Sequence, residues 1–226
     1  MFGAAIVFSR TPVLVKRISE IVPTVVQRDP SPPPGVGHAS VWLADAVREL
    51  GIPVRNDEPP PLSTTPAETA ELTSRLPDRF LALHPGSGSP RKNWPVERFA
   101  ALADALAPQE PFALIDGPAD HEVSARLANI AERAVPVRDR SVSFVAALLR
   151  RARLCVGNDS GVSHLAAAVG TPTLALFGPT DPFVWGPVGA GARTLRAPDG
   201  DLERLEVRTV LDYVSGAWTS SRLMSR

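Results

Sequence analysis

The sequence has one cysteine, no excess charge of either sign and no long apolar run. The single cysteine, Cys155, excludes an internal disulfide and is compatible with a reducing compartment. No stretch reaches the roughly 20 apolar residues of a membrane-spanning helix, and residues 1–4 lack the charged start and apolar core of a signal peptide. The 24 basic residues balance the 24 acidic ones, so net charge favours neither nucleic acid nor a membrane surface. We therefore expect a cytoplasmic protein without a transmembrane segment or a nucleic-acid partner.

Proline, charged and hydroxyl residues gather between residues 55 and 65. A segment of this composition is typical of a linker between domains. A chain of 226 residues can form one large domain or two small ones. We therefore expect a first domain at 1–54, a linker at 55–65, a second domain at 66–204, and a C-terminal helix and tail at 205–226. The apolar stripe of that last helix leads us to expect that it packs back on the first domain.

The second domain alternates short apolar runs with segments of helical length. The runs typical of strands are 80–83, 112–115, 135–137, 154–156 and 173–177. The predicted helices are 66–76, which starts with a capping box, and 96–106, 121–131, 142–151 and 162–169. This alternation predicts an α/β fold with a parallel sheet and helices on both faces. In the first domain, similar patterns predict strands at 4–8 and 22–27 and helices at 13–20 and 38–50.

The turn at residues 157–161 leads from a predicted strand into a predicted helix. The first amides of a helix lack internal partners, and the helix dipole leaves partial positive charge there. Gly161 lets the backbone approach an anion, Ser160 offers a hydroxyl, and His164 lies about one turn into the helix. These three residues predict an anion site. Asp159 belongs to the same site or caps the helix, and both interpretations stay open.

Two further loops follow predicted strands, at the edge where parallel sheets bind ligands. Residues 84–95 contain glycines, serines and Lys92, whose mobile ammonium suits a phosphate. The alternative is a flexible surface loop with Lys92 in water. In residues 116–122, Asp120 suits a helix N-cap. Glu122 lies in the first helical turn, where a carboxylate is stabilised or can accept hydrogen bonds from ribose hydroxyls.

The order of these motifs resembles glycosyltransferase family 9, the family of the ADP-heptose:lipopolysaccharide heptosyltransferases. The resemblance is carried by residues 157–166, 170–172 and 177–182, and upstream by residues 84–87 with Lys92. It implies a GT-B fold of two facing Rossmann-like domains, the second complete here and the first partial. It also implies an enzyme that transfers a sugar, heptose, from an ADP-sugar to a lipopolysaccharide core acceptor without metal or cofactor. Peripheral contact with the inner face of the cytoplasmic membrane is a further expectation.

The resemblance assigns roles to individual residues. The first donor-site loop would contact the diphosphate, and a glutamate in the next loop would contact the ribose. Lys92 and His164 would stabilise the leaving diphosphate. The implied donor-binding residues are Ser87, Gly88, Lys92, Glu122, Asp159, Ser160, Gly161 and His164.

The resemblance also has gaps. The family's opening strand, its glycine- and aspartate-containing loop and its aspartate general base have no counterpart here, so residues 1–54 resemble only the later half of the acceptor domain. The base, the exact sugar and the acceptor stay open, as does the choice between a fragment and a protein with a reduced first domain. The alternative function is a non-catalytic nucleotide-sugar-binding module or a truncated, inactive glycosyltransferase. A nucleotide-sugar epimerase, a hydrolase built on Ser160 and a dinucleotide oxidoreductase are disfavoured because their sequence signatures are missing.

Overall fold

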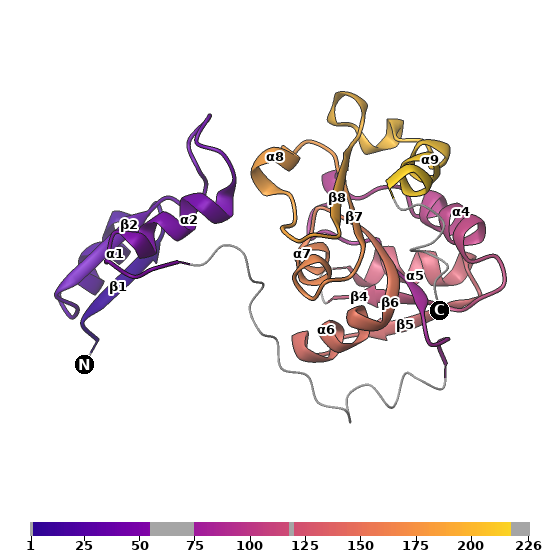
Figure 1. The fold of residues 1–226 in the computed structure, drawn as a ribbon, viewed down its shortest axis with the longest axis horizontal. Helices are drawn as coiled ribbons and strands as arrows, with labels where there is room; N and C mark the ends of the chain where they lie inside the picture. The colour runs from indigo at the N-terminus through magenta and orange to yellow at the C-terminus, as the bar shows by residue number, and fades with distance from the viewer. Residues whose placement is uncertain (1, 55–74, 118–119, 218–226) are drawn as a thin grey trace. The chain divides into compact units, whose positions relative to one another are not determined.

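The computed structural model describes residues 2–54, 75–117 and 120–217, which form two separate α/β units (Figure 1). The first unit comprises residues 2–54 and the short segment Phe183–Trp185, and the second comprises the other described residues. The predicted linker, nearly all of the helix predicted at 66–76 and the end of the predicted tail lie outside the described residues.

The first unit contains one parallel pair of strands and two helices. They are β1 (Ala4–Phe8), α1 (Pro12–Ser19), β2 (Thr24–Arg28) and α2 (Ala39–Arg48). β1 and β2 pair in parallel along their whole length. All four predicted elements are present, with no end shifted by more than two residues. The buried apolar side chains are small, so this unit has a small core; they are Val7, Val22, Ala39 and Ala46.

The second unit is built on a six-stranded parallel sheet. Its strands are β3 (Phe80–His84), β4 (Phe112–Asp116), β5 (Ala134–Arg138), β6 (Ala152–Asn158), β7 (Thr173–Phe177) and β8 (Ala192–Arg196). Their order across the sheet is β5-β4-β3-β6-β7-β8. The chain thus builds outward from β3 through β4 to β5, then returns to the other side of β3 with β6. The connections after β3 and β6 therefore lead in opposite directions across the sheet, and the place where they diverge is the topological switch point, where such sheets bind ligands.

Alternate residues of the strands feed two apolar cores, one on each face of this sheet. Helices α4 (Val96–Leu106), α5 (His121–Ile130) and α9 (Val207–Ala217) cover one face, and α6 (Val142–Arg151) and α7 (Gly161–Ala168) cover the other (Figure 1). Leu81 packs in the first core with Phe99 of α4, whereas its neighbour Phe80 packs in the second core with Phe144 of α6. The predicted parallel sheet with helices on both faces is confirmed.

Helix α9 packs in the core of the second unit, so the expectation that it packs on the first domain is wrong. Val210 and Val214 are fully buried in the core that α9 shares with α4. The residues before α9 are also anchored to the α4 region. Trp94 Nε1 donates to the Leu205 carbonyl at 2.8 Å, and Arg98 Nη1 donates to the same carbonyl at 2.6 Å. An apolar stripe predicts that a helix is buried but does not identify the surface that buries it.

Strand β8 and the short helix α8 (Pro182–Trp185) are not among the predicted elements. β8 is the edge strand of the sheet and pairs with β7. Its residues Arg193 and Arg196 are exposed, so it carries no apolar run of the kind that marks a buried strand.

Candidate functional site

The connections after β3 and β6 meet at the switch point. β3 ends at His84, and the chain then passes through a short 3₁₀ turn, η1 (Pro90–Lys92), into α4. β6 ends at Asn158 and turns through Asp159 and Ser160 into α7. Because β3 and β6 are hydrogen-bonded neighbours, the residues that follow them emerge side by side. The two loops predicted to bind an anion are thereby brought together.

Lys92 reaches from the first connection to the end of β6. Its Nζ lies 3.1 Å from Asp159 Oδ2 and 3.3 Å from the Asp159 carbonyl oxygen. Asp159 Oδ2 also accepts a hydrogen bond of 2.7 Å from Thr180 Oγ1, in the loop after β7. The side chains of Lys92 and Asp159 are 26% and 10% exposed, so their ion pair is partly shielded from water. The alternative prediction, in which Lys92 extends into water, is wrong.

Asn158, which the sequence analysis did not single out, holds the two connections together. Its side chain is fully buried, and its two polar atoms are both used. Oδ1 accepts from the Trp94 N–H at 3.0 Å, and Nδ2 donates to the Pro85 carbonyl at 2.7 Å. Its own carbonyl accepts from Ser163 Oγ of α7 at 2.7 Å. One side chain therefore links the loop that carries Lys92 to β6. The feature of the sequence that could have identified this residue is an asparagine at the last position of an apolar strand.

Ser160 occupies the N-cap position of α7 with extended backbone. Its Oγ is buried and makes no hydrogen bond with any residue that the structure describes. Asp159 precedes the cap and directs its carboxylate to Lys92 and Thr180, so the interpretation of Asp159 as the helix cap is wrong. Buried hydroxyls without a partner are rare in folded proteins. This one lies at the positive end of the helix dipole, where an anion is stabilised.

Gly161 and His164 belong to the first turn of α7 and are exposed. A Cβ built on Gly161 meets no atom within 4 Å, and the His164 N–H donates to the Ser160 carbonyl at 3.3 Å. No described residue therefore fills the space next to Gly161 at the start of α7. A ligand can reach the amides of this turn, which a helix leaves without internal partners.

Ser87 and Gly88 lie in the connection after β3 and bond within the protein. Ser87 Oγ lies 2.8 Å from the Ser89 carbonyl and 2.6 Å from Asn93 Oδ1. Gly88 has a φ of +70°, a left-handed conformation that glycine adopts without strain, and its N–H donates to Asp120 Oδ1 at 3.3 Å. These bonds shape the loop, so Ser87 becomes a ligand for a diphosphate only by exchanging one of them.

Asp120 precedes α5 as predicted, but its side chain does not cap the helix. The carboxylate packs against Gly86, where an added Cβ would lie 2.0 Å from Asp120 Cγ. Asp120 Oδ2 lies 3.8 Å from His84 Nε2, and burial lowers the pKa of His84, which keeps the ring neutral at pH 7. Asp120 thus occupies the predicted N-cap position, but its carboxylate does not make the capping hydrogen bond. The absence of a side chain at Gly86 leaves room for this carboxylate, which links the connections after β3 and β4.

Glu122 belongs to the connection after β4, in the first turn of α5. It is exposed, and its side chain makes no hydrogen bond or ion pair with any described residue. Beside it, the buried Asp116 accepts from Arg138 Nε at 2.8 Å and contacts His121 Nδ1 at 3.2 Å. Thus the structure joins Lys92 directly to Asp159, next to Ser160, whereas Glu122 comes from the adjacent connection and is not joined to them by any bond.

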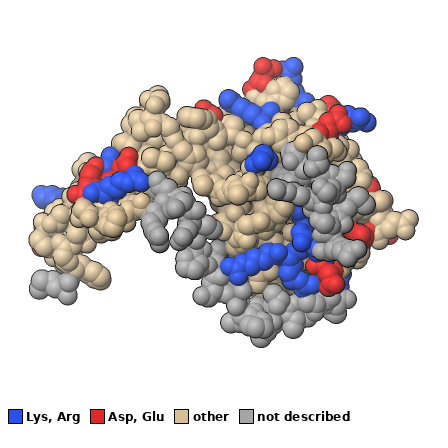
Figure 2. All heavy atoms as spheres, in the orientation of Figure 1, with Lys and Arg blue, Asp and Glu red and all other residues tan. Residues whose placement is uncertain are grey.

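Acidic and basic side chains are interspersed over the face shown in Figure 2. Within residues 2–54, 75–117 and 120–217, no helix has both the length and the apolar character needed to cross a membrane. In the same ranges, no three side chains of His, Cys, Asp or Glu are grouped so that they could hold a metal ion. At the switch point, the ammonium group of Lys92 lies beside the start of α7, and this arrangement suits an anion.

Solved structures with the same fold include a family 9 glycosyl transferase and a heptosyltransferase. The glycosyl transferase family 9 protein from Veillonella parvula matches 88% of this chain and 64% of its own, with a TM-score of 0.73 and 21% identity. The Escherichia coli heptosyltransferase WaaC with ADP matches 96% of this chain and 73% of its own, with a TM-score of 0.72 and 21% identity. At this identity the likeness concerns the fold, and it confirms the α/β fold of GT-B type.

Curated relatives match parts of the chain. Lipopolysaccharide heptosyltransferase 1 of Escherichia coli K12 is 34% identical over 127 residues, which are 55% of this chain and 40% of the relative. Lipooligosaccharide heptosyltransferase 2 of Haemophilus influenzae is 31% identical over 180 residues, which are 71% of this chain and 52% of the relative. The chain thus spans about half or less of these relatives. The model of glycosyltransferase family 9 (heptosyltransferase) matches residues 41–213. The chain therefore belongs to glycosyltransferase family 9.

Proposed function

We propose that the second unit binds the diphosphate of an ADP-sugar at the switch point between β3 and β6. The observation that carries this proposal is that Lys92 meets the end of β6 next to Ser160, whose buried hydroxyl has no partner among the described residues. A diphosphate offers acceptor oxygens to the ammonium, the hydroxyl and the first amides of α7. Gly161 and His164 border the same place on the helix side.

The β3 connection supplies the other proposed ligands of the diphosphate. Ser87 and Gly88 lie in it, and Asp159 orients Lys92 across from it. Glu122 is the proposed ligand of the ribose hydroxyls. The strands run in the order β4, β3, β6, so a diphosphate at the switch point leaves the nucleoside beside β4. An exposed carboxylate that pairs with no described residue is a ready acceptor for vicinal hydroxyls.

On this basis we assign the chain to the transfer of heptose from ADP-heptose to a lipopolysaccharide core acceptor. Negative charge grows on the leaving diphosphate as the bond to the sugar breaks, and groups that are already in place stabilise it best. Lys92, the first amides of α7 and His164 have this role in the proposal, which assigns no step to a metal or cofactor. The curated relatives are named heptosyltransferases, and one structural relative was solved with ADP, which supports this assignment.

The proposed roles of the segments follow the domain boundaries. Residues 1–54 form the acceptor side, residues 55–65 are the linker, residues 66–204 bind the donor, and residues 205–226 contribute a helix and tail. The general base is not assigned to a residue of this chain. Because the acceptor is lipid-linked, we place the reaction in the cytoplasm, with peripheral contact at the inner face of the membrane. Fractionation that recovers the protein without membranes would contradict that contact.

Two measurements separate donor binding from sugar transfer. Calorimetry of the chain with ADP tests the site, and a chain that does not bind ADP refutes the proposal. A turnover assay with ADP-heptose and a truncated core acceptor tests the reaction, because a transferase releases ADP only when the acceptor is present. Binding without transfer supports the alternative, a non-catalytic nucleotide-sugar-binding module or a truncated, inactive glycosyltransferase.

A further inference from the structure

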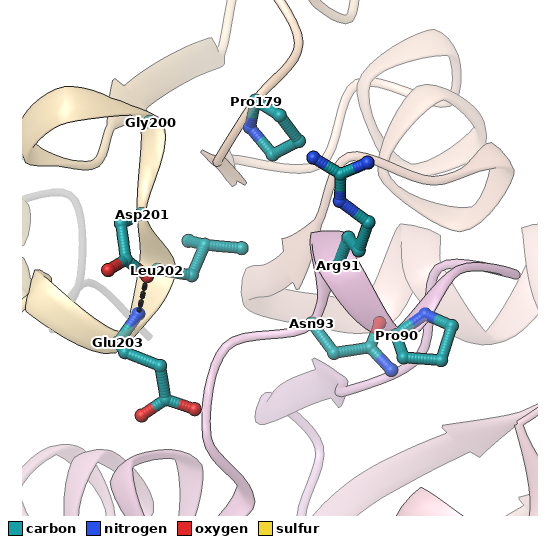
Figure 3. A pocket seen from close by; sticks show the side chains of 8 residues that line it. All are labelled: Pro90, Arg91, Asn93, Pro179, Gly200, Asp201, Leu202 and Glu203. Carbon is teal, nitrogen blue, oxygen red and sulfur yellow. Dashed lines mark hydrogen bonds between the residues drawn. The ribbon is translucent and has the colours of Figure 1, made fainter.

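A pocket of about 310 Å³ lies at the carboxyl ends of β3, β7 and β8 (Figure 3). One wall is Pro90, Arg91 and Asn93 from the turn after β3. The opposite wall is formed by Pro179, after β7, and by the segment from Gly200 to Glu203, after β8. Its volume is at the lower end of the range of about 300–1,000 Å³ found for small-molecule sites. The pocket therefore has room for one small ring rather than for a whole nucleotide sugar.

The polar groups of this pocket are available to a ligand. The side chains of Arg91 and Glu203 are exposed and make no hydrogen bond or ion pair with any residue that the structure describes. Asn93 Oδ1 accepts from Ser87 Oγ at 2.6 Å, and the amide Nδ2 of Asn93 pairs with none of the residues that the structure describes. Asp201 accepts from the Glu203 N–H through Oδ1 at 3.0 Å. The pocket thus offers donors on the Arg91 side and a carboxylate acceptor on the Glu203 side (Figure 3).

The same lining disfavours several classes of ligand. None of the residues that line the pocket is aromatic, so a nucleobase has no ring to stack on. The lining contains two carboxylates and one guanidinium, so a diphosphate meets net negative charge. No His or Cys lines the pocket, and the described residues contain no cluster of metal-ligating side chains. What fits is a neutral ligand that presents both hydrogen-bond donors and acceptors.

A sugar ring has this combination of groups. Its hydroxyls both donate and accept, so they pair with Arg91, Asn93 and Glu203. Its C–H faces are apolar, and Pro90 and Pro179 supply apolar surface from the two walls of the pocket. We propose that this pocket is a saccharide subsite that holds one pyranose ring of the donor sugar or of the acceptor saccharide. The proposal rests on the proposed function, and it adds residues on which that function does not depend.

The position of the pocket supports this inference. Arg91 and Lys92 are consecutive residues of η1, and Pro179 directly precedes Thr180, which donates to Asp159. The saccharide subsite therefore adjoins the proposed diphosphate site along the sheet edge. It lies on the β7 and β8 side, whereas Glu122 lies on the β4 side. A nucleotide sugar bound across the switch point therefore has its nucleoside near Glu122, on the β4 side, and its sugar in the pocket, on the β7 and β8 side.

The experiment compares three probes on the full chain by calorimetry: ADP, ADP-heptose and a lipid-free core oligosaccharide. The variants are Arg91→Ala and Glu203→Ala. The matched controls are Arg17→Ala and Glu132→Ala, which replace exposed residues outside this pocket whose side chains pair with no described residue. Circular dichroism and a thermal melt verify that each variant is folded. We expect both pocket variants to lose about tenfold or more in affinity for one saccharide probe and to change ADP affinity less than twofold.

Each outcome of this experiment decides the question. A loss confined to ADP-heptose supports the subsite with the donor sugar as its ligand, and a loss confined to the oligosaccharide supports it with the acceptor. Unchanged affinity for both saccharide probes, or an equal loss for ADP, overturns the inference. If the unmodified chain fails to bind ADP, the proposed function fails. The oligosaccharide measurement still tests the pocket in that case, because it requires no nucleotide.

Discussion

Replacing Lys92 by alanine removes the ammonium group on which the proposed diphosphate site depends. The Nζ lies 3.1 Å from Asp159 Oδ2, and the two side chains are 26% and 10% exposed, so water screens the charge only in part. A hydrogen bond between charged groups is worth roughly 1.5–3 kcal/mol, which corresponds to a change of about 10- to 150-fold in Kd. The variant also leaves the Asp159 carboxylate facing a diphosphate without its cation. We therefore expect Lys92→Ala to weaken ADP binding by at least tenfold.

The chain provides a matched control, because Lys16 is its other lysine. Lys16 is on α1 in the first unit, away from the switch point in the sequence. Calorimetry with ADP should give Lys16→Ala the affinity of the unmodified chain. Equal ADP affinity in Lys16→Ala and Lys92→Ala would refute the assignment of Lys92 to the diphosphate.

With two lysines, the same idea can be tested without mutation. Acylation of the chain with a lysine reagent, followed by mass spectrometry, reports the reactivity of Lys16 and Lys92 separately. ADP should slow acylation of Lys92 because its ammonium is then bound to phosphate, and it should leave Lys16 unaffected. Protection of neither lysine would place the nucleotide elsewhere.

Three further predictions concern the scaffold around the site. Asn158→Ala should lower the free energy of unfolding by about 2–4 kcal/mol in urea titrations, since it leaves a buried amide and a buried carbonyl unpaired; a loss under 1 kcal/mol would contradict this. Gly86→Ala should cost about 1–3 kcal/mol by overlap with Asp120, and less in an Asp120→Gly background; additive costs would show that the two residues are independent. Burial lowers the pKa of His84, so the unfolded chain binds its proton more readily and stability should fall as the pH drops below about 6.5. Unfolding at about pH 7.5 and 5.5 should show a smaller fall for His84→Gln, and an equal fall would exclude His84 as a source of it.

Several parts of the fold follow from the sequence because their cause is local. A run such as residues 173–177 is apolar at every position, which is typical of a strand covered on both faces, and all five residues of β7 are buried. Ser160 and Gly161 mark the start of α7 because the residue types at a helix start depend on the unpaired amides next to them. The loop with Lys92 was identified from its glycines, its charge and its place after a strand.

Other parts depend on contacts between residues far apart in the chain. The role of Asn158 requires that β6 lies beside β3, since its partners Trp94 and Pro85 come from the connection after β3. The partner of Asp120 depends on a space at Gly86 in another loop. These residues were missed or misassigned because no local pattern encodes a partner that is dozens of positions away.

The sequence by itself thus determined most of the strands and helices of the central sheet and which loops are candidates for ligand binding. The tertiary structure decided which loops meet. The order β5-β4-β3-β6-β7-β8 places Lys92 against Asp159, adds β8 at the edge and buries α9 beside α4. The physical reason is that hydrophobic periodicity records how each segment is buried, whereas strand order and helix docking depend on how well whole surfaces pack together.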